Sequence, residues 1–168
     1  MLTPEPLSLS KIIKISAAHN YSAALDSTGN VYVWGENHYM QFGSTSNIIS
    51  KPYKIASGCI DIEAGEGALA LIYNDHIKLA GFKIYKEFQR VDFPTKHAMV
   101  SVGDMYAAYN DIHGEVYSLG GLFSGKSRSS FFIRPPKLKF ERVPADFFPG
   151  KVKYIKGKYG YHTAIIDI

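Results

Sequence analysis

The chain has 168 residues, a formal net charge of +4 and a sequence pI near 9.0, and 46% of its residues are apolar. Such a chain can bury a sizeable core. Its single cysteine, Cys59, excludes an internal disulfide, and no stretch approaches the roughly 20 apolar residues of a membrane span. The start of the chain lacks the apolar run of a signal peptide, so the sequence predicts an intracellular protein, cytoplasmic or nuclear.

Residues 11–43 contain three short apolar runs and leave no room for a helix. Ile12–Ala18 and Tyr21–Leu25 are rich in β-branched and small apolar residues. The third run, Val31–Trp34, follows a turn at Asp26–Gly29, where glycine supplies the positive φ angle of a tight reversal. The segment therefore predicts three consecutive antiparallel strands.

This three-strand unit recurs 85 residues further along the chain without a gap. The matched pairs are Ile15 and Val100, Ala18 and Gly103, Tyr21 and Tyr106, Asp26 and Asp111, Gly29 and Gly114, Val31 and Val116, Tyr32 and Tyr117, and Gly35 and Gly120. A degenerate copy lies between them, around Ile62 and Ile77–Gly81. A fourth copy begins at Val152 and reaches Ile168 before its third strand. The first two copies are 47 residues apart, a period typical of the blades of a propeller.

The first copy reads I-S-A-A-x-x-Y-S-A-A-L-D-x-x-G-x-V-Y-V-W-G-E-N-x-x-x-Q-F-G, which resembles the repeat of the regulator of chromosome condensation family. Members of that family fold as seven-bladed β-propellers. The resemblance runs from about Lys11 to the C-terminus. It implies an all-β fold, a partial (half) β-propeller of about three four-stranded blades plus an incomplete fourth. The sequence departs from the family at Ala18, usually Gly, and at Tyr21, Tyr106 and Tyr161, usually His.

We predict a single propeller segment over residues 1–168. Its blades are expected at about 11–56, 57–94 and 95–144, with an incomplete fourth blade at about 150–168.

Several local features are expected around these blades. Prolines bar a central strand but permit an edge strand, so Met1–Ser10 is expected along the outside of the first blade, whose outer strand proper is Lys51–Ile55. Lys83–Phe88 is expected to form a remodelled loop. Val31 and Val33 alternate with Tyr32 and Trp34, and all four are expected in the core.

A long connection separates the third copy from the fourth. Leu122–Pro136 carries Lys126, Arg128 and Arg134 around Phe131 and Phe132. Aromatic residues and arginine are the usual anchors of protein interfaces, and long loops tend to be functional. The sequence thus predicts a partner-binding loop. A contact with chromatin or nucleic acid is a further alternative, which the mild net charge does not favour.

The fourth copy also predicts an open sheet edge. Thr163, Ala164, Ile165 and Ile166 form an apolar strand with no third strand after it, and such an edge invites a strand from another chain. Seven blades need roughly 45 residues each, so this chain supplies about half a ring. The free flank of the first blade, near Met1–Ile15, is expected to be open in the same way. We expect one or more protein partners that complete the open propeller. The alternatives are a separate half-propeller, the remainder of a longer gene product and, as the weaker form, a second copy of this chain.

Motifs that could indicate catalysis fail on their context. Gly65–Ala70 matches a dinucleotide-binding pattern but continues as a strand, where that motif requires a helix. Gly157–Gly160 resembles an RNA-binding clamp but lies at a corner between strands. The histidines lack metal-ligand spacing, and His19, Ser22 and Asp26 lack a nucleophile elbow. We expect no catalytic residue, no cofactor and no metal.

The resemblance implies a function only by analogy. We expect a non-catalytic protein-interaction scaffold that is a subunit or segment of a larger assembly. Some family members are guanine nucleotide exchange factors for small GTPases, so exchange activity, with a small GTPase as partner, is the alternative. No residue of this sequence can be matched to that activity.

Overall fold

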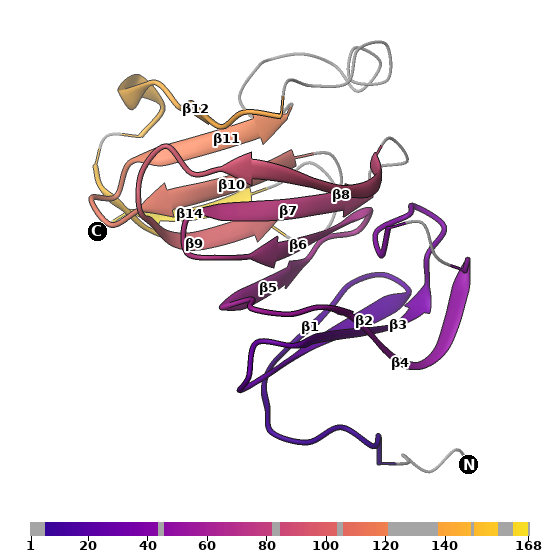
Figure 1. Ribbon diagram of the computed structural model, residues 1–168. Coiled ribbons are helices and arrows are strands. Elements are labelled where there is room, and N and C mark those ends of the chain that lie inside the picture. The colour runs from indigo at the N-terminus through magenta and orange to yellow at the C-terminus, as the bar shows by residue number, and fades with distance from the viewer. Residues whose placement is uncertain are drawn as a thin grey trace.

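The computed structural model describes residues 6–43, 46–81, 85–103, 106–120, 138–148, 150–157 and 163–167. They form four antiparallel sheets, which we call blades 1 to 4 in chain order (Figure 1). Three blades have four strands, and the fourth has two among the described residues. This architecture confirms the predicted all-β, partial propeller.

The strand bounds are as follows. Blade 1 consists of β1 (Ile12–Ala17), β2 (Tyr21–Asp26), β3 (Val31–Glu36) and β4 (Ile48–Ala56). Blade 2 consists of β5 (Asp61–Ala64), β6 (Ala68–Ile72), β7 (His76–Gly81) and β8 (Tyr85–Asp92). Blade 3 consists of β9 (His97–Val102), β10 (Tyr106–Asp111), β11 (Val116–Gly120) and β12 (Glu141–Arg142). Blade 4 contains β13 (Val152–Gly157) and β14 (Thr163–Asp167), and a short 3-10 helix (Ala145–Phe147) precedes it.

Each blade is a meander in which neighbouring strands pair in chain order. The first strands of successive blades also lie next to one another, since β1 contacts β5, β5 contacts β9 and β9 contacts β13. These first strands therefore follow the axis of the propeller, and the fourth strands lie outside. Blade 1 lies at one end of the arc of sheets (Figure 1).

The 85-residue repeat is reproduced in the strands. β9 and β10 begin and end 85 residues after β1 and β2, and both pairs have a register shift at the same place, beside Asp26 in one and Asp111 in the other. Gly29 and Gly114 have φ angles of 83° and 78°, which confirms the predicted glycine turns.

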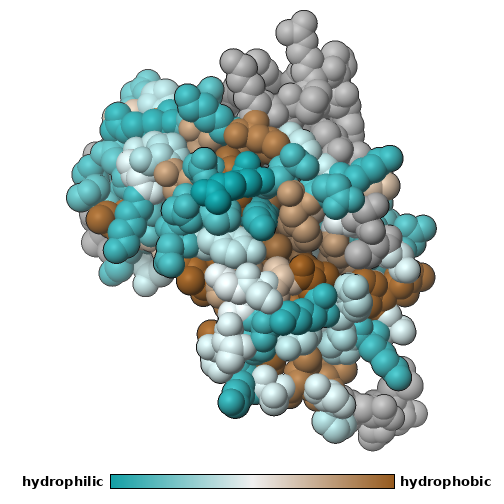
Figure 2. Space-filling model, in the orientation of Figure 1, coloured by the Kyte–Doolittle hydropathy of each residue, from teal (hydrophilic) through white to brown (hydrophobic). Residues whose placement is uncertain are grey.

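The apolar core lies between successive blades. Between blades 1 and 2 it includes Tyr21, Ala23, Leu25, Val31, Val33, Phe42, Ile62, Leu69 and Leu71. Between blades 2 and 3 it includes Ala70, Ile72, Ile77, Leu79, Val100, Val102, Tyr109, Tyr117, Leu119 and Phe140. Between blades 3 and 4 it includes Tyr106, Ala108, Val116, Val143, Val152 and Ile155. Apolar side chains are visible along the boundary between blades 1 and 2 (Figure 2). Each of these three apolar clusters thus lies between the facing sides of two neighbouring blades.

Two expectations about strands were wrong. The described part of the lead-in, residues 6–10, forms no strand, and β4 is the outer strand of blade 1. The expected loop at Lys83–Phe88 instead contains the start of β8, which pairs with β7 and reaches Asp92. Phe88, the last residue of that segment, packs against the core between blades 1 and 2.

The expectation that four alternating residues of β3 lie in the core was half right. Val31 and Val33 are fully buried against blade 2. Tyr32 and Trp34 are only half-buried, because they point to the opposite face of blade 1, and no blade among the described residues covers that face.

Candidate protein-interaction surface

The same repeat position is exposed in blade 1 and buried in the other three blades. Ile15 is 75% exposed, whereas the aligned residues are 0% exposed at Ile62, 6% at Val100 and 0% at Ile155. Each of these three packs against the blade that precedes its own. The side of blade 1 that bears Ile15 is therefore the side that a preceding blade covers elsewhere in the molecule.

Three further residues of blade 1 show the same contrast. Ala17 is exposed, and Ser22 and Trp34 are half-buried. Strand pairing places them on one face with Ile15, because Ala17 pairs with Ser22 and Ser22 pairs with Trp34. The aligned residues of blades 2 and 3 are all buried, namely Ile62, Ala64, Leu69 and Ala80, and Val100, Val102, Ala107 and Leu119. We call Ile15, Ala17, Ser22 and Trp34 the blade 1 flank.

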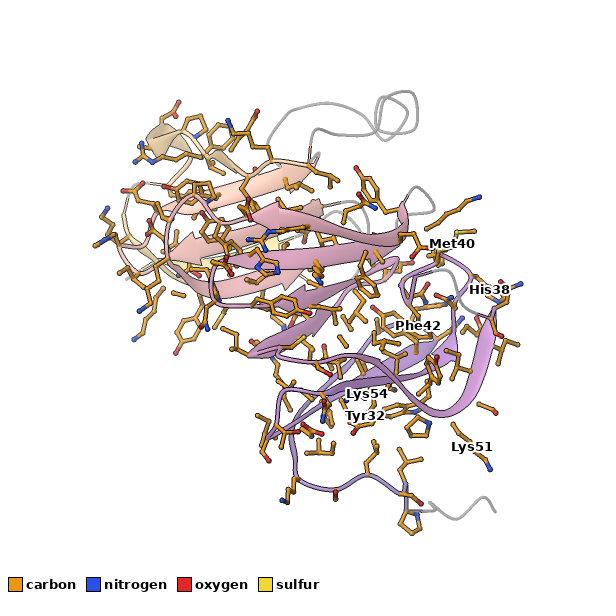
Figure 3. The ribbon with its side chains drawn as sticks, viewed as in Figure 1. Tyr32, His38, Met40, Phe42, Lys51 and Lys54 are labelled. Atoms are coloured by element: carbon orange, nitrogen blue, oxygen red, sulfur yellow. The ribbon has the colours of Figure 1, made fainter. Side chains whose placement is uncertain are left out.

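Polar groups border the flank. Tyr32 of β3 pairs with Lys54 of β4, and the two side chains lie close together on blade 1 (Figure 3). The Tyr32 hydroxyl is 3.3 Å from Oδ2 of Asp26, to which it donates a hydrogen bond. Phe42, by contrast, lies between blades 1 and 2 and meets the Tyr21 ring edge-on, with 5.2 Å between the ring centroids (Figure 3).

Exposure of an isoleucine in the first strand is not by itself diagnostic. Ile13 is 64% exposed, but the aligned Ile60 is 46% exposed, and Ala98 and Lys153 at the same repeat position are exposed too. Position 13 is therefore solvent-facing in every blade. It provides an internal reference for Ile15, which lies two residues further along β1.

Hydrogen bonds between blades accompany the apolar contacts. The N–H of Ala64 in blade 2 donates to Ser16 Oγ of blade 1 at 3.0 Å. The Tyr21 hydroxyl of blade 1 donates to the carbonyls of Gly65 and Ala68 at 2.9 and 2.8 Å. Burial raises the pKa of Tyr21 well above its ordinary value, and the nearby Glu63 carboxylate raises it further, so the hydroxyl remains a donor.

An ion pair joins blades that are not neighbours. Glu63 of β5 is almost fully buried, and Lys156 of β13 donates to its Oε1. Blade 3 lies between the two in the chain. The two side chains can still meet, because the first strands of all described blades lie side by side along the propeller axis.

Hairpin turns at the other end of the strands are fixed by carboxylates. The Asp26 carboxylate accepts hydrogen bonds from the backbone and side chains of Thr28 and Asn30 at 2.7 to 3.0 Å. Burial alone would raise the pKa of Asp26, but these hydrogen bonds outweigh it and hold the pKa far below its usual range. Asp111 holds the equivalent turn of blade 3 through the N–H groups of His113 and Glu115.

A polar hollow of about 230 Å³ lies beside the β1–β2 corner and is lined in part by His19, Asn20, Glu36, His38 and Glu66. Asn20 Nδ2 donates to Glu36 Oε2 at 2.7 Å, and His38 Nε2 lies 3.4 Å from the same oxygen. Within the described residues there is no group of three or more His, Cys, Asp or Glu side chains that could hold a metal ion.

The structure places only some of the residues that the sequence singled out for binding. Lys126, Arg128, Phe131, Phe132 and Arg134 lie outside the described residues, so the predicted loop stays a prediction.

Thr163, Ala164, Ile165 and Ile166 lie in β14, which pairs antiparallel with β13 and with no other described strand. Strand addition at this edge stays a prediction as well.

Sequence reasoning pointed to the open side of the first blade, near Met1–Ile15, but did not identify the four residues of the blade 1 flank as a candidate site. The signal was present in the repeat, because Ile15 aligns with Ile62, Val100 and Ile155. Alignment of an apolar position indicates burial, however, and only the structure identifies which copy is left exposed.

Comparisons with known proteins fit this geometry. The sequence profile of the regulator of chromosome condensation (RCC1) repeat matches residues 12–41. Protein pim1 of Schizosaccharomyces pombe is 48% identical over 42 residues, which are 25% of this chain and 8% of pim1. The crystal structure of yeast RCC1 (Prp20) bound to Kap60 superposes with a TM-score of 0.76 at 14% identity, covering 96% of this chain and 43% of that chain. Residues 12–41 thus match the RCC1 repeat, and the chain as a whole shares the fold of these propellers.

Other solved structures share the fold of these RCC1-like repeats. Prp20p from Saccharomyces cerevisiae, whose binding properties to Gsp1p and histones were studied, superposes with a TM-score of 0.75 at 14% identity, covering 95% of this chain and 44% of that chain. Human WBSCR16 gives a TM-score of 0.71 at 14% identity, with 94% and 44% covered. The chain thus spans less than half the length of each of these proteins. Among the helices described here, none is long and apolar enough to cross a membrane.

Proposed function

We propose that this propeller segment is a non-catalytic protein-interaction scaffold, and that its blade 1 flank binds another protein within a larger assembly. The observation that carries the proposal is the 75% exposure of Ile15 at a repeat position that is almost fully buried in the other described blades. A sheet face patterned for burial but left open is a typical docking surface.

The energetics of the flank support binding. Covering a large apolar side chain stabilises by about 1.5–3 kcal/mol, and the flank offers Ile15 and Trp34 for this purpose. Its neighbours Ala17 and Ser22 are small, so another sheet can approach closely. Association also costs translational and rotational freedom, so the flank needs a partner that covers its whole width.

The polar groups of the described junctions support a structural role. Ser16 and Tyr21 hold the adjacent blade, Asp26 and Asp111 hold hairpin turns, and Glu63 pairs with Lys156. These groups are engaged in positioning blades and not gathered around a reactive group.

The test compares two lysine substitutions on one strand. Ile15→Lys places a charge in the proposed interface and should weaken association by at least about 100-fold, because a buried unpaired charge costs several kcal/mol. Ile13→Lys changes a position that is exposed in every blade and should have no effect. Complexes isolated from cells that express each full chain are sized by light scattering.

The expected result is a large complex for the wild type and for Ile13→Lys, and a free 18.7 kDa chain for Ile15→Lys. Circular dichroism checks that both variants stay folded. Equal complex sizes for the two folded variants, or a free wild-type chain, would contradict the proposal.

Exchange activity on a small GTPase is the competing function. The fold shared with Prp20p, whose binding to Gsp1p was studied, favours it. We expect no acceleration of nucleotide release when the purified chain is added at micromolar concentration to a GTPase loaded with fluorescent nucleotide. The described residues offer only part of a ring for a GTPase to contact. Faster release would support the exchange function instead.

A further inference from the structure

Two side chains of blade 1 satisfy backbone groups of blade 2. Ser16 Oγ accepts the N–H of Ala64, and the Tyr21 hydroxyl donates to the carbonyls of Gly65 and Ala68. The serine lies in the first strand and the tyrosine five residues later, at the start of the second strand. Together they form a Ser-x4-Tyr pattern that holds the corner of the next blade.

The junction between blades 3 and 4 has the same serine contact. Ser101 Oγ accepts the N–H of Gly157 at 2.7 Å and lies 3.2 Å from its carbonyl oxygen, to which it donates. Tyr106 follows Ser101 by five residues, occupies the repeat position of Tyr21 and is buried. Two of the three described junctions therefore use a serine hydroxyl from the preceding blade.

The junction between blades 2 and 3 differs from the other two in the residues of both blades. Blade 2 has Glu63 in place of the serine and Ala68 in place of the tyrosine. Blade 3 has Val102 where the following blades of the other two junctions have Ala64 and Gly157. We call a junction that uses a serine hydroxyl of the preceding blade a serine junction. Both serine junctions have a small residue at this position of the following blade. A hydroxyl can approach the backbone N–H of a small residue without meeting a branched side chain.

The blade 1 flank has the small residue of a serine junction. Ala17 occupies the repeat position of Ala64 and is exposed, and the carbonyls of Ala18 and Tyr21 correspond to those of Gly65 and Ala68. The backbone is in the same arrangement, because the Ala18 N–H donates to the Tyr21 carbonyl as the Gly65 N–H donates to the Ala68 carbonyl.

We propose that the blade 1 flank binds a propeller blade of a separate polypeptide that carries a Ser-x4-Tyr pattern. Its serine hydroxyl accepts the N–H of Ala17, and its tyrosine hydroxyl donates to the carbonyls of Ala18 and Tyr21. Its apolar face covers Ile15 and Trp34. This inference rests on the proposed scaffold function and specifies the chemistry of the partner.

A second copy of this chain fits the flank poorly. Blade 4 has Lys156 at the serine position, and that side chain is already paired with Glu63 of its own chain. Blades 1 and 3 carry the serine and the tyrosine, but blades 2 and 4 already cover the faces that present them. The Ser-x4-Tyr blade proposed for the flank is therefore none of the four described blades of a second copy.

Site-specific photocrosslinking identifies what covers the flank. The full chain is expressed in its own cells with p-benzoylphenylalanine in place of Trp34, which keeps an aromatic ring on the flank. The control carries the same group in place of Tyr53, an aromatic residue that is 54% exposed and pairs with Val33 on the opposite face of blade 1. Crosslinked peptides are sequenced by mass spectrometry.

We expect the probe at position 34, and not the probe at position 53, to crosslink to a propeller-repeat peptide with Ser-x4-Tyr. In that partner, serine to alanine and tyrosine to phenylalanine should each weaken binding by about 2- to 10-fold, as the loss of one or two hydrogen bonds predicts. A crosslink to a second copy, to a protein without propeller repeats or to nothing would overturn the proposal, and so would unchanged binding by both partner variants.

The crosslinking experiment and the lysine substitutions distinguish a failure of the present inference from a failure of the scaffold function. If Ile15→Lys abolishes the complex but the crosslinked peptide is not a Ser-x4-Tyr blade, the scaffold function stands and the present inference fails. If Ile15→Lys and Ile13→Lys behave alike, both fail.

Discussion

Single polar residues decide how the ends of the strands are closed. The Asp26 carboxylate collects hydrogen bonds from Thr28 and Asn30 and is one of the few buried acidic groups of the described residues. Hydrogen bonds to the ionised form stabilise it, so Asp26 binds a proton less readily in the folded chain than in the unfolded chain.

This difference predicts a loss of stability in acid. The contribution of Asp26 is fully present above the unfolded pKa of about 4 and decreases as the pH falls below that value. Urea unfolding between pH 7 and pH 2.5 should therefore show a smaller decrease in the free energy of unfolding for Asp26→Asn than for the wild type. Asp146→Asn, at an exposed site, is the matched control and should follow the wild type. Parallel curves for all three proteins would argue against this role of Asp26.

At the scale of elements, the third strand of blade 1 has a glycine next to its last residue, where the backbone of the second strand approaches closely. Gly35 has a φ angle of +112°, and a Cβ atom there would lie 2.4 Å from the Asn20 carbonyl oxygen. Gly81 ends the third strand of blade 2 with a φ angle of +111° and is in equally close contact, with the Gly67 carbonyl oxygen 2.2 Å from its Cβ position. The close approach of backbones fixes the corner of each blade.

Two alanine substitutions separate the energetic cost of the backbone conformation from the cost of this close contact. Gly58→Ala adds a Cβ with nothing within 4 Å at a φ angle of +73°, so it should cost about 1–2 kcal/mol of unfolding free energy from the left-handed conformation alone. Gly35→Ala should cost about 1–3 kcal/mol more, because the added atom also overlaps the backbone. Urea denaturation measures the free energy of unfolding of both variants. Equal losses in the two variants would show that the backbone at the corner shifts to accept the added Cβ atom without cost.

The elements were largely predictable from sequence, and their surroundings were not. The 85-residue recurrence predicted the strands of blades 1 and 3 because pattern and turn glycines are local signals. The sequence predicts a loop at the start of β8 because the segment lacks the family's residues there, but strand pairing with β7 decides its conformation. Trp34 was expected in the core because alternation reports two faces of a strand but not whether a second sheet covers each face.

At the scale of the whole molecule, the contacts between blades mostly join neighbouring blades, as in other repeat proteins. The ion pair between Glu63 and Lys156 is an exception because it joins blade 2 to blade 4. It should make the unfolding of these blades more cooperative than contacts between neighbours alone would.

Removal of the lysine tests this coupling. Lys156→Met leaves the Glu63 carboxylate buried without its cation and should lower the free energy of unfolding by about 1–3 kcal/mol, a moderate cost because the lysine itself is largely exposed. The double variant Glu63→Gln/Lys156→Met should lose less than Lys156→Met alone. Lys153→Met, at an exposed position on the same strand, should change stability by no more than about 0.5 kcal/mol. Equal losses in both lysine variants would exclude a specific coupling.

Trp34 is the sole tryptophan of the chain, and it lies half-buried on the blade 1 flank. Its indole ring is therefore a native optical probe at the surface where a partner is proposed to bind. Removal of water from around the ring should move its fluorescence emission to shorter wavelength and protect it from quenching by iodide. Occupancy of the flank can thus be followed in solution without an added dye, provided that the partner's own tryptophans are replaced or subtracted.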